Sequence, residues 1–149
     1  MSSLFVAFVL LTGCDLSYTV GQLFIRNESG QSLYVESNIV SEHTSETCCF
    51  LLEVGDEARL GKSPRYDGHA SYLPLSHCVY NDDAYVSIFT IDDNEEKHLA
   101  RTWYYSDRDK DGKQLFNENY LDKDFSDSPD GGNFPCFVFV VLPEDLESN

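Results

Sequence analysis

The run Cys136–Leu142 is the feature that most constrains how this chain can fold. Its sequence, Cys-Phe-Val-Phe-Val-Val-Leu, is bounded by Pro135 and Pro143. β-Branched and aromatic residues favour strands, and an apolar pattern on both faces is typical of a strand that is covered on both sides. We therefore expect a central β-strand here, with the other strands arranged around it.

Several other stretches also predict strands. Residues 23–35 predict a hairpin, because apolar residues alternate with polar ones on either side of a turn at Asn27–Gly30. No long stretch has a 3.6-residue period, and the one helix candidate is Gln114–Leu121, about two turns. The further predicted strands are Thr47–Val54, Ala84–Ile91 and Leu99–Tyr105.

These patterns predict an all-β fold, specifically a two-sheet antiparallel β-sandwich of immunoglobulin-like or transthyretin-like style with at most one short helix. The chain shows no internal repeat and no linker. We expect residues 21–149 to form a single domain, because this length is typical of one domain and is sufficient to bury a core.

Residues 1–14 indicate where the protein resides. Leu4–Leu11 is an apolar run, and it leads into Gly13 and Cys14. The run is too short to span a bilayer, which takes ~20 residues, but it suits a secretory signal of ~7–15. A buried strand or core helix is the alternative. The ending Leu-Thr-Gly-Cys resembles the lipobox of bacterial lipoproteins.

That resemblance implies a lipid-anchored protein of the bacterial cell envelope. In this family the signal peptide, here residues 1–13, is removed, and the thiol of Cys14 carries acyl chains such as palmitate. Residues 14–20 would then be a lipidated tether, and two or three acyl chains make such an attachment effectively permanent. The domain would lie on the periplasmic or the cell-surface face of a membrane, and both remain open.

Four cysteines remain once Cys14 carries lipid, and an even number in an oxidising compartment predicts two disulfides. A bond between the adjacent Cys48 and Cys49 would close a strained ring. The two other pairings each connect these residues to both Cys78 and Cys136. A metal site at these cysteines is the alternative, but no Cys-x-x-Cys spacing supports it.

The acidic composition excludes some partners. The chain has 26 acidic residues against 10 basic ones, a formal net charge of −16. Such a charge argues against nucleic acid and against adsorption to anionic lipid. The acidic runs at residues 92–96 and 122–130 are expected to be solvated loops, with metal binding as the alternative.

One acidic segment, residues 107–118, resembles the calcium loop of the EF-hand family. Acids stand at its first, third and fifth positions, glycine at the sixth and glutamate at the twelfth. The predicted calcium ligands are Asp107, Asp109, Asp111 and Glu118. A polar turn without metal is the alternative, because the eighth position is a glutamine and the preceding residues have the pattern of a strand.

An aromatic pair beside an arginine is a further candidate site. Trp103 alternates with Leu99, Arg101 and Tyr105 along a predicted strand, so the four would share one face. Such a face either forms a platform for a sugar ring or an aromatic peptide, or packs in the core.

Signatures of common enzyme classes are missing. The chain contains no Gly-x-Ser-x-Gly, His-Glu-x-x-His or Gly-x-Gly-x-x-Gly, and its four histidines have no spaced carboxylate partner. We therefore expect no enzyme but a binding or structural module whose partner is an envelope protein or a glycan. A calcium-binding module and a small hydrolase are the alternatives.

Overall fold

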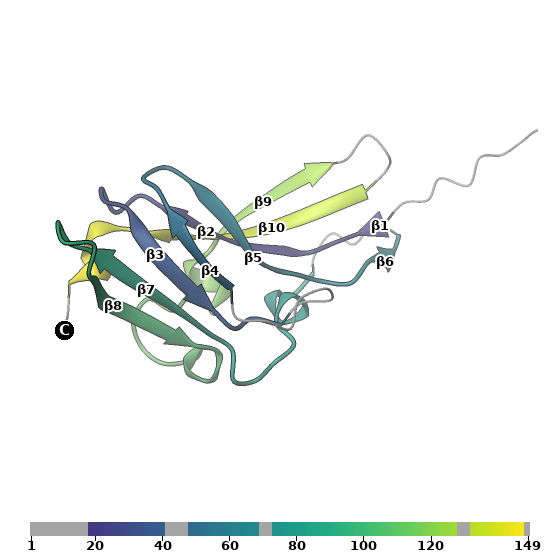
Figure 1. Cartoon of the computed structure of the whole chain (residues 1–149). Coiled ribbons are helices and arrows are strands. Elements are labelled where there is room, and N and C mark those ends of the chain that lie inside the picture. Colours follow the sequence, from purple (N-terminus) through teal and green to yellow (C-terminus); the bar gives the residue numbers. More distant parts are fainter. Residues whose placement is uncertain (1–17, 41–47, 69–72, 128–131, 148–149) are drawn as a thin grey trace, which may run out of the picture.

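The structure, a computed structural model, describes residues 18–40, 48–68, 73–127 and 132–147. These residues form ten β-strands and four short 3-10 helices (Figure 1). The predicted all-β class is confirmed. No helix among the described residues has the length and apolar character needed to cross a membrane.

The larger sheet has six strands and is organised around β10 (Gly132–Val141). β10 runs parallel to β1 and β2 on one side and antiparallel to β9 on the other. The prediction of a central strand at Cys136–Leu142 is therefore confirmed. The expectation that the sheets are antiparallel throughout is wrong for this sheet, because the chain returns to it in the same direction after crossing the smaller sheet. The other strands of this sheet are β1 (Tyr18–Thr19), β2 (Gln22–Asn27), β5 (Glu57–Lys62), β6 (Tyr66–Asp67) and β9 (Asp122–Asp127).

Four strands of this sheet, β1, β5, β6 and β9, lie where the sequence predicted none, and two of them fall in segments expected to be a tether or a loop. β1 falls within residues 14–20, which were expected to be tether, so the sheet begins by Tyr18. β9 falls within the acidic run 122–130, which was expected to be a loop, and the side chains of Asp122, Lys123 and Asp124 are exposed. β9 forms because its backbone groups pair with those of β10. Its charged side chains suit an edge strand, because they discourage pairing with other chains.

The smaller sheet has four antiparallel strands in the order β4 (Cys48–Leu52), β3 (Leu33–Ser37), β7 (Tyr85–Ile91) and β8 (Lys97–Tyr104). The strands predicted at residues 47–54, 84–91 and 99–105 are confirmed within a few residues at their ends. The predicted hairpin at residues 23–35 is wrong, because β2 and β3 belong to different sheets.

A buried asparagine explains why the chain changes sheets after β2. The side chain of Asn27 is fully buried and donates to the carbonyl oxygens of Gln31 and Leu52, at 2.8 and 2.9 Å. Its Oδ1 accepts hydrogen bonds from the backbone N–H and the hydroxyl of Ser29. Because a buried amide must satisfy its polar atoms, this set of bonds holds the turn as a crossover instead of a hairpin.

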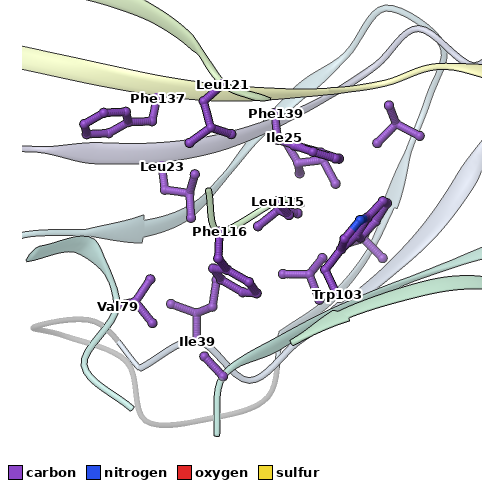
Figure 2. Packing of buried hydrophobic residues seen from close by; sticks show 14 of the residues in the cluster. Leu23, Ile25, Ile39, Val79, Trp103, Leu115, Phe116, Leu121, Phe137 and Phe139 are labelled. Atoms are coloured by element: carbon purple, nitrogen blue, oxygen red, sulfur yellow. The ribbon is translucent and has the colours of Figure 1, made fainter. Parts of the chain in front are cut away.

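Both sheets supply side chains to one hydrophobic cluster (Figure 2). Leu23, Ile25 and Phe139 come from the six-stranded sheet, and Trp103 comes from β8. Leu115 and Phe116 lie between them in Figure 2, although they belong to the segment that joins β8 to β9. This segment therefore contributes to the core and is not a peripheral loop.

The predicted two-turn helix at Gln114–Leu121 is wrong. Only Glu118–Tyr120 forms a turn of 3-10 helix, η3. The preceding residue, Asn117, has an extended backbone, and its side chain accepts a hydrogen bond from the N–H of Asn119. Leu115, Phe116 and Leu121 are all buried, and burying them takes precedence over helical periodicity. The other 3-10 helices are η1 (Leu75–Cys78), η2 (Tyr105–Asp107) and η4 (Pro143–Leu146).

Candidate functional site

The four predicted disulfide cysteines are free thiols in the structure, so the expectation of a disulfide-stapled domain is not met. Cys48 and Cys49 are exposed on β4, at the edge of the four-stranded sheet. Cys78 belongs instead to η1 and is packed against Gly21, where an added Cβ would lie 3.2 Å from its Sγ. Two cysteines can form a disulfide only if their segments meet in space, and the spacing of cysteines in the sequence does not show which segments meet.

Cys78 is fully buried, which disfavours its thiolate form. Burial raises the pKa of Cys78 to about 12, so the group stays un-ionised at physiological pH. Cys136 is half-buried on β10, and its Sγ donates to the carbonyl oxygen of Phe134 at 3.3 Å. The proposed lipidation site, Cys14, lies outside the described residues.

The four predicted calcium ligands do not gather around one point. Asp107 pairs with Lys110 at 2.9 Å, and the side chain of Asp109 is 87% exposed. Asp111 is exposed as well. Glu118 accepts from the backbone N–H of Leu75 at 2.8 Å and pairs with Lys123. Residues 107–118 are all described, and no three of their carboxylates lie within ligand distance of one another.

The segment 107–118 is instead attached to the core through its middle. The indole Nε1 of Trp103 donates to the carbonyl oxygen of Lys113 at 3.1 Å. Lys113 in turn donates to the carbonyl oxygen of Val140 and pairs with Asp145, whose side chain is only 2% exposed. Asp145 also accepts from the N–H of Leu142. These bonds join η4, β10 and the segment into one unit.

The aromatic platform predicted at Trp103 is absent, because Trp103 is only 2% exposed. Its ring packs edge-on against Phe139 with centroids 4.9 Å apart. Arg101 lies 3.6 Å from Asp145, and the ring of Tyr105 packs against Phe116. These residues consequently serve packing, which was the alternative interpretation of the pattern.

A β-bulge explains which residues of β8 point outward. The register with β7 shifts by one residue at Ala100, so that Arg101 pairs with Ile88 but Leu99 pairs with Phe89. One extra residue reverses the alternation of side chains between the two faces. Leu99 is therefore 59% exposed while Trp103 is buried.

The reversal completes an apolar row across the outer face of the four-stranded sheet. Leu51 pairs with Tyr34, Tyr34 with Phe89, and Phe89 with Leu99, so one residue from each strand lies in line. We call these four residues the apolar row. Leu51 is 51% exposed, and the rings of Tyr34 and Phe89 meet edge-on at 6.2 Å. The ammonium of Lys97 lies 3.1 Å from the centroid of the Tyr34 ring.

A polar row borders the apolar row along the same sheet. Ser87 and Thr102 share a hydrogen bond of 2.8 Å between their hydroxyl oxygens. The hydroxyl of Tyr85 donates to Glu36 at 2.6 Å, and this bond raises the pKa of Tyr85 to about 12. The sheet thus presents an exposed apolar strip with a hydrogen-bonded polar margin, which is the anatomy of many protein interfaces.

Comparison with known proteins adds no candidate. The chain matches no protein-family model, no curated protein and no solved structure. Of the residues in the apolar row, the sequence pointed only to Leu99, as a neighbour of Trp103 on one strand face. It gave no reason to choose Tyr34, Leu51 or Phe89, because which face of a strand is exposed depends on how the sheets pack.

Proposed function

We propose that this chain is a lipid-anchored protein of the bacterial cell envelope whose β-domain binds a partner protein through the apolar row. We also propose that the two sheets form a β-sandwich, since both supply side chains to one cluster. The observation that carries the binding proposal is the apolar row itself, which places two leucines, each more than half exposed, in line with two aromatic rings.

The opposite side of the domain supports this choice of surface. On the six-stranded sheet, two of the three outward residues of β2, Gln22 and Arg26, are engaged in polar pairs, and the third, Phe24, is half-buried. Arg26 binds Glu57 at 2.8 Å, and Gln22 accepts from Arg59 at 3.3 Å. The outer face of the four-stranded sheet has a continuous apolar strip instead, and exposed strips of this kind mark interaction sites more often than scattered apolar residues do.

A protein partner fits the row better than a glycan. Sugar rings stack on exposed aromatic faces, and the sequence candidate for that role, Trp103, is buried. Both ends of the row are aliphatic, and the central Tyr34 already has Lys97 over its ring. Apolar side chains of a partner would replace water over Leu51 and Leu99, while the polar margin would remain hydrated.

The anchor rests on Leu4–Leu11 and Cys14, and the start of β1 limits how far the domain can move from it. Tyr18 is the fourth residue after Cys14, and four residue steps allow about 14 Å at full extension. A lipidated Cys14 would therefore hold the domain next to the membrane. A partner for the apolar row would be a protein at the same membrane surface.

Metabolic labelling tests the anchor. Bacteria that express the full chain are grown with an alkyne-tagged palmitate, and the label on the protein is measured after click coupling. We expect label on the unchanged chain and on Cys48→Ser, which alters an exposed cysteine elsewhere, and none on Cys14→Ser. Equal labelling of all three proteins, or of none, would contradict the anchor.

Site-specific photo-crosslinking in the same cells tests the binding surface. A photoreactive residue replaces Leu51 or Leu99 in the row, or Val54 as a control of similar exposure, 53% against 51% for Leu51. We expect one discrete adduct from the two row positions and none from Val54. Leu99→Glu should abolish the adduct formed at position 51. Adducts of equal yield at all three positions would argue against the row.

A further inference from the structure

Three potential metal ligands converge at the turn between β7 and β8. Asp92 follows the last residue of β7, Glu96 immediately precedes β8, and His98 is the second residue of β8. The turn is closed by backbone bonds between Asp92 and Glu96 and between Glu95 and Asp92. One ligand atom from each of Asp92, Glu96 and His98 lies within 4.8 Å of the others.

Asp92 is held in position by its own turn. Its Oδ1 accepts from the backbone N–H groups of Asn94 and Glu96, both at 2.9 Å. Its Oδ2 is thereby directed at Nε2 of His98, 3.1 Å away. The bond from His98, followed by those from the backbone N–H groups, lowers the pKa of Asp92, so the carboxylate is ionised at neutral pH.

The nearest lysine does not block this group. Lys97 stands between Glu96 and His98 in the sequence, but its ammonium lies over the ring of Tyr34. Successive residues of a strand point to opposite faces, so Lys97 is directed away from His98. Within the described part of the chain, no lysine or arginine pairs with Asp92 or Glu96, and the one ion pair in the group is that of His98 with Asp92.

We propose that Asp92, Glu96 and His98 bind a divalent transition-metal ion of the zinc class. Two carboxylate oxygens and one imidazole nitrogen suit zinc and its neighbours, whereas calcium and magnesium prefer oxygen ligands alone. The histidine is what separates this group from the other acidic turns of the chain. Coordination through Nε2 of His98 requires that atom to be unprotonated, so its proton passes to Nδ1 or to solvent.

Three protein ligands leave at least one coordination position open. Structural zinc sites have four protein ligands, whereas sites with three keep a water or accept a group from another molecule. All three residues lie near the surface, with the side chains of His98 and Asp92 58% and 34% exposed. The inference does not depend on the apolar row or on the lipid anchor.

Isothermal titration of the full chain with zinc tests the proposal. The chain carries Cys48→Ser and Cys49→Ser, so that the exposed thiols do not compete for the metal, and has no histidine tag. We expect one zinc per chain. His98→Gln and Asp92→Asn should each weaken binding at least about tenfold, because each removes one of three ligands. Calcium should bind at least about tenfold more weakly than zinc.

Two matched variants separate coordination from simple attraction by negative charge. Asp93→Asn and Glu95→Gln remove the same charge from the same turn but lie outside the group of three. We expect both to bind zinc within about twofold of the parent protein, since long-range attraction to one exposed charge is weak. Equal losses in all four variants, or no zinc binding by the parent, would overturn the proposal. Thermal melts without metal verify that each variant is folded.

Discussion

Two acidic segments of this chain, residues 92–98 and residues 107–118, can be compared as metal sites. Their sequences indicate a site in the second segment, but ligand atoms converge in the first. The second has the spacing of a calcium loop, yet its carboxylates point to separate partners and its middle enters the core. The first has no recognised motif, yet three ligand atoms converge in it. The difference lies in what surrounds each segment.

A ligand motif works only when the backbone follows the path that the motif assumes. The EF-hand loop is held between two helices, whereas residues 107–118 connect β8 to η3 and β9. In the turn at residues 92–98, by contrast, the ligands come from the two sides of a hairpin, and cross-strand pairing brings them together. Pairing of strands can therefore bring ligands together into a site that the spacing of residues in the sequence does not reveal.

The largest effect expected from this comparison is at Leu115. Leu115→Ala should lower the free energy of unfolding by about 2–5 kcal/mol, because a fully buried side chain is removed from the core. Urea denaturation measures the change, and Gln114→Ala, at the neighbouring and less buried position, is the control. A loss below about 0.5 kcal/mol at Leu115, the size of an ordinary surface change, would mean that the segment is peripheral.

A smaller loss is expected at Asp145, which connects the same segment to the rest of the domain. Asp145→Asn keeps the size of the side chain but removes the charge that faces Lys113 and Arg101. We expect a loss of about 1.5–3 kcal/mol in the same denaturation experiment, the range for hydrogen bonds to charged groups. Glu144→Gln, next to it and exposed, should change stability little. Equal effects of the two changes on stability would show that Asp145 does not connect the segment to the rest of the domain.

Calcium should have almost no effect on the second segment. We expect the melting temperature of the full chain to be the same in calcium and in chelator, since its carboxylates are engaged elsewhere or dispersed. Asp109→Ala should change stability by no more than about 0.5 kcal/mol. A rise in melting temperature with calcium that Asp109→Ala abolishes would show that residues 107–118 bind calcium. The two segments would then not differ as described.

The smallest effect concerns the pKa of Asp92. His98→Gln removes the main cause that lowers this pKa, so the value should move up toward its ordinary 3.8. Because the folded pKa is the lower one, the contribution of Asp92 to stability is present at higher pH and is lost as pH falls through it. Titration by NMR of the carboxyl carbon measures the shift, and His77→Gln should leave it unchanged.

The local features of the fold could be predicted, and the contacts between distant segments could not. Strands β4, β7, β8 and β10 follow from β-branched and aromatic residues in short runs, which is a local property. β9 could not be found in the same way, because its residues are charged and it forms only by pairing with β10. The hairpin at residues 23–35 failed because one buried asparagine directs the chain to the other sheet.

The candidate sites depended even more on tertiary structure. Spacing in the sequence placed Leu99, Arg101 and Trp103 on one face, and a single extra residue in β8 moved Leu99 to the other. That shift both buries the tryptophan and completes the apolar row.

The sequence by itself determined the all-β class and the position of the central strand, because both depend on residues that are neighbours in the chain. Only the tertiary structure decided which strands pair, which side chains are exposed and where Asp92, Glu96 and His98 meet. The physical reason is that pairing and burial are settled by competition among all segments for the same core and the same backbone hydrogen bonds.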